Sequence, residues 1–374
     1  MNRRQIGALI ISLATVAALS APAAAAIASW QVVKSPDPGK NGPYVARYFR
    51  EVTAASAAGV WAVGGTSGEA ILANWTGTAW RLASLPHPTT YTLRAIDTNG
   101  SAVWAVGAAS SGSPAVLQLS SGTWQYSEIG GAPASTSPND LTVISSSDVW
   151  VVGYSPSTLA AVALHWNGST WSSQPPPVPA GASGVQLNRV EQIPGTAKVI
   201  AVGYYVKSSN FFPYAVEWTG SAWQVMSTSA SQQGEFDGVV VRSVSAPWAV
   251  GYTNPSALYP KPLIERWTGT SWQPVKAPSR AYANYLYAVD AKNSSDIWAV
   301  GYTNGPSGFA TLALHWNGSA WSLGTTANPY PGFDQFFGVS YVPGTSTFWA
   351  VGSQGPARPG VLGENTLTEQ CTGC

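Results

Sequence analysis

Three histidines and two cysteines are the residues whose types most directly suggest metal or redox chemistry. His165 and His315 each precede a Trp-Asn-Gly sequence at the same position of a repeated unit, and His87 stands alone between two prolines. Other units fill that position with Asn74, Glu217 and Arg266. Because a zinc site needs three or four clustered ligands, we expect no metal and no cofactor, and interpret both repeat histidines as satisfied surface residues.

The two cysteines, Cys371 and Cys374, form a C-x-x-C sequence at the C-terminus. A reactive cysteine needs an electropositive setting, whereas Cys374 is the last residue and lies beside its own carboxylate. We therefore expect a small local disulfide or an intermolecular link rather than a redox site.

Paired carboxylates could perform acid–base hydrolysis, which for a glycosidase requires two of them about 5–9.5 Å apart. Five acids lie in or near segments that join successive repeated units, namely Glu51, Asp140, Glu235, Asp237 and Asp334. No G-x-S-x-G, phosphate-binding loop or H-E-x-x-H sequence occurs. We assign no catalytic residue and favour binding over catalysis; the alternative is an extracellular hydrolase or oxidoreductase with a site in a central funnel.

The amino-acid composition excludes two classes of protein. The 374 residues carry a net charge of +1, only 9% charged side chains and 18 tryptophans. Disorder follows from low hydrophobicity with high net charge, and nucleic-acid binding from an excess of Lys and Arg. Neither class fits, so we expect a folded protein that does not bind nucleic acid.

The N-terminal segment has the pattern of a secretory signal. Asn2-Arg3-Arg4 is followed by an apolar run from Ile6 to Ala18 and by an alanine-rich stretch up to Ala28. The run is shorter than the ~20 residues of a membrane span. We expect residues 1–28 to be removed and the mature protein to be secreted, with no transmembrane segment.

A repeat with a period near fifty organises the rest of the chain. Trp-Ala-Val-Gly or a close variant ends at glycines 64, 107, 153, 203, 251, 301 and 352. A second motif, exemplified by Trp75-Thr-Gly-Thr-Ala-Trp80, follows each of the first six and is typical of a tight β-hairpin. With a short β-type run opening each unit, the sequence predicts four strands per unit and an all-β, seven-bladed β-propeller.

All eighteen tryptophans belong to this repeat framework, including Trp30. In Trp-Ala-Val-Gly, strand alternation puts Trp and Val on one face and Ala and Gly on the other. We expect the bulky face of one blade to nest against the small residues of the next.

The N-terminus is predicted to close the ring. After the seventh anchor, Gly360–Leu367 supplies a third strand but no fourth follows, whereas Ser29–Pro36 closely matches Ser271–Pro278 at an outermost strand. Residues 29–36 should therefore complete the last blade. The domains predicted are a signal at 1–28, a propeller at 29–367 and a cysteine-containing tail at 368–374.

Gly64-Gly65, Trp75 and Trp80 follow a pattern that resembles kelch-type repeats, as in the central domain of galactose-oxidase-like proteins. The chain also resembles secreted bacterial proteins built from Trp-Ala-Val-Gly and His-Trp-Asn-Gly-Ser-x-Trp units. It departs from kelch where a single glycine precedes tyrosine, as at Gly301-Tyr302. The resemblance implies a propeller but no single function.

Aromatic loops and recurring arginines are the candidate binding residues. The loops that join the second strand to the third, and one blade to the next, lie at one face and carry many tyrosines and phenylalanines. The candidates are Arg50, Arg94, Arg189, Tyr204, Tyr205, Phe211, Phe212, Arg242, Tyr252 and Tyr302. We expect a monomeric recognition or scaffold module that binds a glycan, a cell-envelope component or an extracellular protein.

Overall fold

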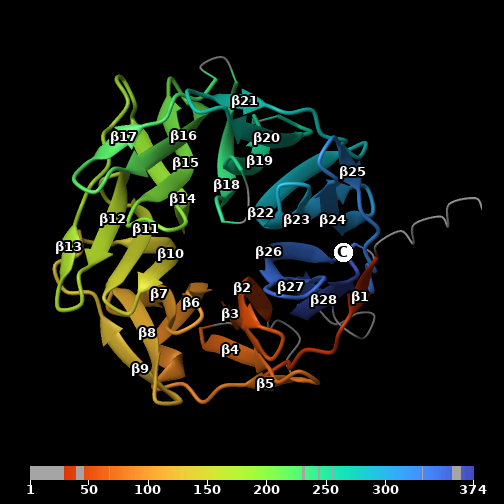
Figure 1. Cartoon of the computed structure of the whole chain (residues 1–374), viewed down its shortest axis with the longest axis horizontal. Coiled ribbons are helices and arrows are strands. Elements are labelled where there is room, and N and C mark those ends of the chain that lie inside the picture. Colours follow the sequence, from red (N-terminus) through yellow and green to blue (C-terminus); the bar gives the residue numbers. More distant parts are fainter. Residues whose placement is uncertain are drawn as a thin grey trace, which may run out of the picture.

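Seven four-stranded antiparallel sheets surround a central axis in the computed structural model of the protein (Figure 1). The structure describes residues 29–38, 46–66, 68–229, 232–242, 245–254, 257–330, 332–355 and 364–374. The predicted signal at 1–28 lies outside them. The seven-bladed β-propeller expected from the repeat is confirmed, with four strands in every blade.

Each blade runs from an innermost strand at the axis to an outermost strand at the rim (Figure 1). Blades 1 to 3 contain β2 (Tyr48–Ser56), β3 (Gly59–Gly65), β4 (Ala70–Trp75), β5 (Trp80–Leu82); β6 (Tyr91–Thr98), β7 (Val103–Ala109), β8 (Pro114–Ser120), β9 (Thr123–Glu128); β10 (Ser137–Ser145), β11 (Asp148–Ser155), β12 (Ala160–Trp166) and β13 (Trp171–Ser173). Blades 4 and 5 contain β14 (Gly184–Gln192), β15 (Val199–Lys207), β16 (Asn210–Trp218), β17 (Trp223–Val225); β18 (Gly234–Val240), β19 (Trp248–Thr253), β20 (Pro262–Trp267) and β21 (Trp272–Pro274). Blades 6 and 7 contain β22 (Ala283–Asn293), β23 (Asp296–Gly305), β24 (Gly308–Trp316), β25 (Trp321–Leu323); β26 (Gln335–Val342), β27 (Thr347–Gln354), β28 (Asn365–Thr372) and β1 (Trp30–Val32). The one helical element described is a short 3-10 turn, Pro88–Thr90.

Tryptophans join each blade to its neighbour. The indole of Trp150 in β11 lies 4.9 Å from that of Trp218 in blade 4, and Trp349 in β27 lies 4.8 Å from Trp75 in blade 1. The other second-strand tryptophans contact the next blade in the same way. Aromatic pairs of this kind stabilise a core beyond their buried area. The bulky side of each repeat therefore packs on the next blade's indoles.

The glycine of Trp-Ala-Val-Gly has a different role from the one expected. A Cβ built on Gly64 would lie 2.0 Å from the carbonyl oxygen of Tyr48, and one on Gly107 would lie 1.6 Å from that of Thr92. These contacts are to the innermost strand of the same blade, so the predicted nesting against the next blade does not hold for the glycines. It does hold for the alanines, because Trp349 and Val351 of blade 7 share a buried cluster with Ala62 of blade 1, and blades 5 and 6 repeat this arrangement with Ala299 and Ala350. Glycine is required because the innermost backbone approaches too closely for any side chain.

A β-bulge causes this close approach in every blade. In blade 1, Phe49 pairs with Gly64 and Glu51 with Val63, which leaves Arg50 unpaired between them. The register shifts at the same place in the other six innermost strands. A bulge reorients the extra residue's side chain, so each blade places one additional side chain at the axis.

The N-terminal strand closes the ring as predicted. Trp30 in β1 pairs with Cys371 in β28, and its indole is 1% exposed. The third strand of blade 7, predicted at Gly360–Leu367, is β28 (Asn365–Thr372), which continues to Thr372 instead of ending at Leu367; positions 360–363 lie outside the described residues. Residues 368–372 therefore belong to the blade and not to a tail, since they pair with β27 on one side and residues 369–371 pair with β1 on the other.

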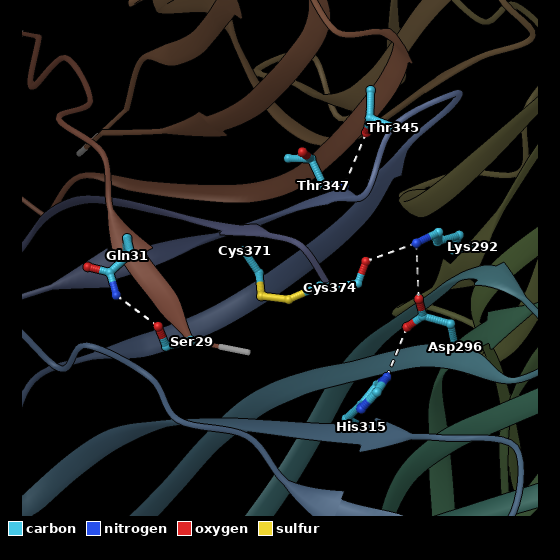
Figure 2. The surroundings of a disulfide bond; sticks show 9 residues. All are labelled: Ser29, Gln31, Lys292, Asp296, His315, Thr345, Thr347, Cys371 and Cys374. Atoms are coloured by element: carbon cyan, nitrogen blue, oxygen red, sulfur yellow. Dashed lines mark hydrogen bonds and ion pairs between the residues drawn. A yellow bond between two sulfur atoms is a disulfide. The ribbon is translucent and has the colours of Figure 1, made fainter. Parts of the chain in front are cut away.

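A disulfide joins Cys371 to Cys374 at the end of β28 (Figure 2), in agreement with the first of the two alternatives above. The Cys374 carbonyl accepts a hydrogen bond from the Lys292 ammonium at 3.1 Å. Lys292 also lies 3.6 Å from Asp296, which bonds to His315 at 2.9 Å. The C-terminus is thus tied to blade 6.

Candidate functional site

The seven bulge residues all line one recess at the mouth of the central channel. They are Arg50, Arg94, Asn139, Asn188, Asp237, Tyr287 and Phe337. This mouth recess has a cavity volume of about 160 Å³ and lies where the innermost strands begin. Because second-to-third-strand loops and blade-to-blade loops reach the same end of each antiparallel blade, it opens on the predicted loop face.

The residues around each bulge are far more uniform than the bulge residues themselves. Two positions after the bulge, every blade has an aliphatic residue, and all seven are buried and line the channel. They are Val52, Ile96, Leu141, Val190, Val239, Val289 and Val339. The framework thus constrains its neighbours but leaves the bulge position free to vary in charge, polarity and shape.

Two arginines form the cationic side of the mouth recess. Arg50 is exposed and its guanidinium lies 5.5 Å from the centre of the Phe337 ring, whereas Arg94 is half-buried and donates to the Asn139 amide oxygen at 3.2 Å. Burial, and then the charge of Arg50, lower the pKa of Arg94. Among the described residues, neither arginine has a carboxylate within 4.0 Å. Both guanidinium groups are therefore free to meet an anion.

Arg189, in contrast, is already neutralised. Its guanidinium, in blade 4, forms an ion pair with Glu51 of blade 1 and lies 3.5 Å from Asp140 of blade 3. The Asp140 carboxylate also accepts the Val190 backbone N–H at 2.8 Å. These two acids consequently link blades 1 and 3 to blade 4 through Arg189.

Amides and a carboxyl group occupy the next sector of the recess. Asn139 donates to the Leu187 carbonyl at 2.8 Å, and Asn188 donates to the Phe236 carbonyl at 2.8 Å and to Asp237 at 3.0 Å. Each amide thus reaches the following blade. Burial and the nearby charge of Glu235 raise the pKa of Asp237 well above its usual range.

Aromatic rings complete the mouth recess. Tyr287 stacks on Tyr302 with ring centres 5.5 Å apart, and the two hydroxyls lie 3.3 Å apart. Phe337 meets Tyr287 edge to face at 6.0 Å. Tyr252 packs against Tyr285 behind them. Each ring is supported by a neighbour and so is held in a fixed orientation.

Ion pairs cross the opposite end of the channel. Arg242 contacts Glu191 at 2.6 Å and Asp97 at 3.3 Å, so one guanidinium bridges blades 5, 4 and 2. Glu191 accepts the Val241 N–H at 2.5 Å, and burial raises its pKa to about 6. Asp290 accepts the Tyr341 N–H at 2.8 Å in the same manner. At this end of the channel, ion pairs and hydrogen bonds therefore join neighbouring and opposite blades.

The candidate residues from the sequence fall into three groups. Arg50, Arg94 and Arg189 line the mouth recess, and Tyr302 supports it through Tyr287. Arg242 lies at the other end of the channel. The remaining tyrosines and phenylalanines lie on the mouth face outside the recess, where Tyr204 packs on Phe211, Tyr205 on Phe212 and Tyr252 on Tyr285.

Sequence reasoning missed Asn139, Asn188 and Tyr287 as recess residues. A signal was present, because buried apolar residues of each innermost strand lie three apart, as in Leu286 and Val289, instead of two apart. A break in the strand period of two is what a bulge produces.

The two repeat histidines are satisfied, as expected. His165 bonds to Asp148 at 2.8 Å and stacks on Trp150 at 4.4 Å, and His315 repeats this arrangement on Trp298. Within the described ranges, no group of three or more His, Cys, Asp or Glu residues is placed to hold a metal ion. No helix in that part of the chain has the length and hydrophobicity of a membrane span.

The fold and its lined mouth define a seven-bladed β-propeller with an axial recess. No family model matches the chain, and no curated protein is significantly similar to it in sequence. Among solved structures, it is similar to YCF48 bound to a D1 peptide, with a TM-score of 0.59 and 14% identity over 93% of this chain and 100% of that one. It is also similar to YCF48 from Cyanidioschyzon merolae, with a TM-score of 0.58 and 12% identity over 92% and 99%. At such identities the similarity shows the fold alone.

Proposed function

We propose that the protein is a secreted β-propeller that binds an extended segment of a protein partner across its mouth recess. The single observation that carries the proposal is the bulge in all seven innermost strands. It aims seven side chains of different chemistry into one recess, while the surrounding framework repeats. A rigid scaffold that varies only its convergent positions suits recognition of a chemically asymmetric ligand.

The charges favour a ligand with an acidic group. Arg50 and Arg94 lie on neighbouring blades, and a guanidinium pair binds a carboxylate through paired hydrogen bonds. Like charges at short range also repel each other, and an anion bound between them relieves this repulsion. An acidic side chain of a protein segment supplies such a group.

A protein segment fits this recess better than a neutral glycan does. Sugars stack on open aromatic faces, but Arg50 lies over Phe337 and Tyr302 is stacked on Tyr287. The propeller of similar fold bound to a D1 peptide supports this choice of ligand. The signal pattern at 1–28 supports secretion, and the kelch-like repeat pattern remains our interpretation of the blades.

The test is selection of a random dodecamer peptide display library on the purified mature protein, residues 29–374. Peptides carrying Asp or Glu should be enriched. Their affinity should fall at least tenfold when Arg50→Gln and Arg94→Gln are combined, because the two unpaired guanidinium groups are lost.

Arg81→Gln is the matched control, because Arg81 is an exposed arginine on outermost strand β5. Its peptide affinity should equal that of the unmodified protein. Failure to enrich any peptide, together with binding on a glycan array, would contradict the proposal and favour a sugar ligand. Enriched peptides whose affinity is unchanged by the double substitution would show that they bind outside the mouth recess.

A further inference from the structure

An apolar groove between blades 3 and 4 opens directly from the mouth recess. It has a cavity volume of about 140 Å³ and is lined mainly by carbon, with Tyr154, Leu159, Val185, Gln186, Tyr204 and Val206 as its principal residues. Tyr154 and Gln186 line both the groove and the mouth recess. The groove therefore adjoins the recess, and one extended ligand can reach both.

Leu159 is held at the rim of the groove in a conformation that leucine disfavours. Its φ is 55°, in the left-handed region, and its side chain is 56% exposed. The corresponding loops of blades 1, 2 and 6 have glycine at positive φ, at Gly68, Gly112 and Gly308. Blades 4 and 5 have small polar residues at positive φ in this loop, Ser208, Ser209 and Asn254. Blade 3 thus carries a large apolar side chain where these five blades have glycine or a small polar residue.

The backbone of Leu159 is firmly fixed. Its N–H donates to the Ser155 carbonyl at 2.8 Å, and its own carbonyl accepts the Val185 N–H of blade 4 at 2.9 Å. Strained, over-determined residues cluster at ligand-binding sites. An exposed leucine held by two elements beside an open groove has the features of a preformed contact surface.

We propose that this groove receives a large apolar side chain of the same protein segment whose acidic group binds Arg50 and Arg94. The inference rests on the proposed function and makes it more specific. The ligand is an extended peptide with an acidic residue and, a few residues away, an aliphatic or aromatic residue. Arg94 and Tyr154 both line the mouth recess, and Tyr154 also lines the groove, so the two subsites adjoin.

The experiment uses fluorescent synthetic copies of the peptides selected from the dodecamer library. Leu159→Asn and Leu159→Gly should each weaken binding at least tenfold, because the apolar rim is removed. Both residues tolerate positive φ, so the thermal midpoint should not fall. Loss of binding without loss of stability separates a contact role from a structural one.

A double-mutant cycle identifies the partner group. Replacing the apolar peptide residue by alanine should weaken binding to the unmodified protein, but should add little further loss with Leu159→Asn. The acidic peptide residue should couple in this way to Arg94→Gln. Leu82→Asn, an exposed leucine on β5 that is 46% accessible, is the matched control and should bind normally.

Selected peptides whose affinity changes less than twofold with both Leu159 variants would overturn this inference and leave the proposed function standing. Selected peptides that share an acid but no apolar residue would overturn it as well. If no peptide is selected at all, both the inference and the proposed function fail.

Discussion

Gly301 packs directly against the carbonyl oxygen of Tyr285. A Cβ atom built on the glycine would lie 1.9 Å from that oxygen. The bulged residue Tyr287 follows two positions later and lines the mouth recess. The glycine that recurs in every repeat therefore permits the bulge, and the bulge position is the one whose residue varies most between blades.

Replacing Gly301 by alanine should lower the free energy of unfolding by about 2 kcal/mol or more, because overpacking a close backbone contact forces the two strands apart. Urea denaturation measures the change. Gly130→Ala serves as the control, since a Cβ there meets open space. A Gly301→Ala or Gly301→Leu protein that unfolds like the unmodified one would show that the bulge tolerates a side chain.

Removing residues 29–36 should abolish cooperative unfolding, because blade 7 would lose strand β1 and the indole of Trp30. The milder change Trp30→Ala should cost about 3–5 kcal/mol, as expected for a fully buried tryptophan. Thermal unfolding followed by circular dichroism distinguishes these outcomes. An unchanged transition in the shortened protein would refute ring closure by β1.

Glu265 makes stability depend on pH. It is fully buried in β20, and within the described residues neither of its carboxyl oxygens has a hydrogen-bond partner. Burial raises its pKa from 4.5 to about 7. Below pH 4.5 the group is neutral in both the folded and the unfolded state. Between pH 4.5 and about 7 the unfolded state loses the proton while the folded state keeps it, so stability falls as pH rises through this range and levels off above it.

Glu265→Leu should therefore gain stability over the unmodified protein as pH rises from 4.5 to 8, by roughly 3 kcal/mol for a shift of about 2.5 pH units. Leucine already occupies this position in other blades, for example Leu314. Glu265→Gln should lose the pH dependence without the full gain, because its buried amide remains unsatisfied. A stability difference that is constant with pH would contradict the raised pKa.

Reducing the Cys371–Cys374 disulfide should lower the free energy of unfolding by about 2 kcal/mol, because a bond three residues apart closes only a small loop. The double variant with serine at both positions should match the reduced protein. Denaturation with and without reductant measures this. Complete unfolding on reduction would mean that the disulfide, rather than β1 pairing, maintains the ring.

The number of blades and the ring closure were predictable because both follow from repetition. Seven glycines at near-constant spacing set the number of blades, and the likeness of Ser29–Pro36 to Ser271–Pro278 places the missing strand. Such patterns depend on local strand chemistry, which every blade shares. The third strand of blade 7 departs from the hairpin motif, and there the predicted strand ends too early.

The site was harder to predict because the role of each residue depends on where the fold places it, and not on its residue type alone. Arg50 and Arg242 both appear as arginines near innermost strands, yet one lines the mouth recess and the other is paired with Glu191 at the opposite end. Leu159 has no sequence signal at all, since its importance lies in a positive φ that only the folded loop reveals. Which side chains converge is a property of the closed ring.

The pairing of Trp30 with Cys371 also has a consequence for the order of folding. β1 is the first strand of the propeller along the chain and β28 is the last, so their sheet joins the segments that are farthest apart in sequence. Contacts of high separation form slowly, because a long chain must be closed before they stabilise it. We therefore expect ring closure to be a late step of folding, after the six blades that are each built from one continuous segment.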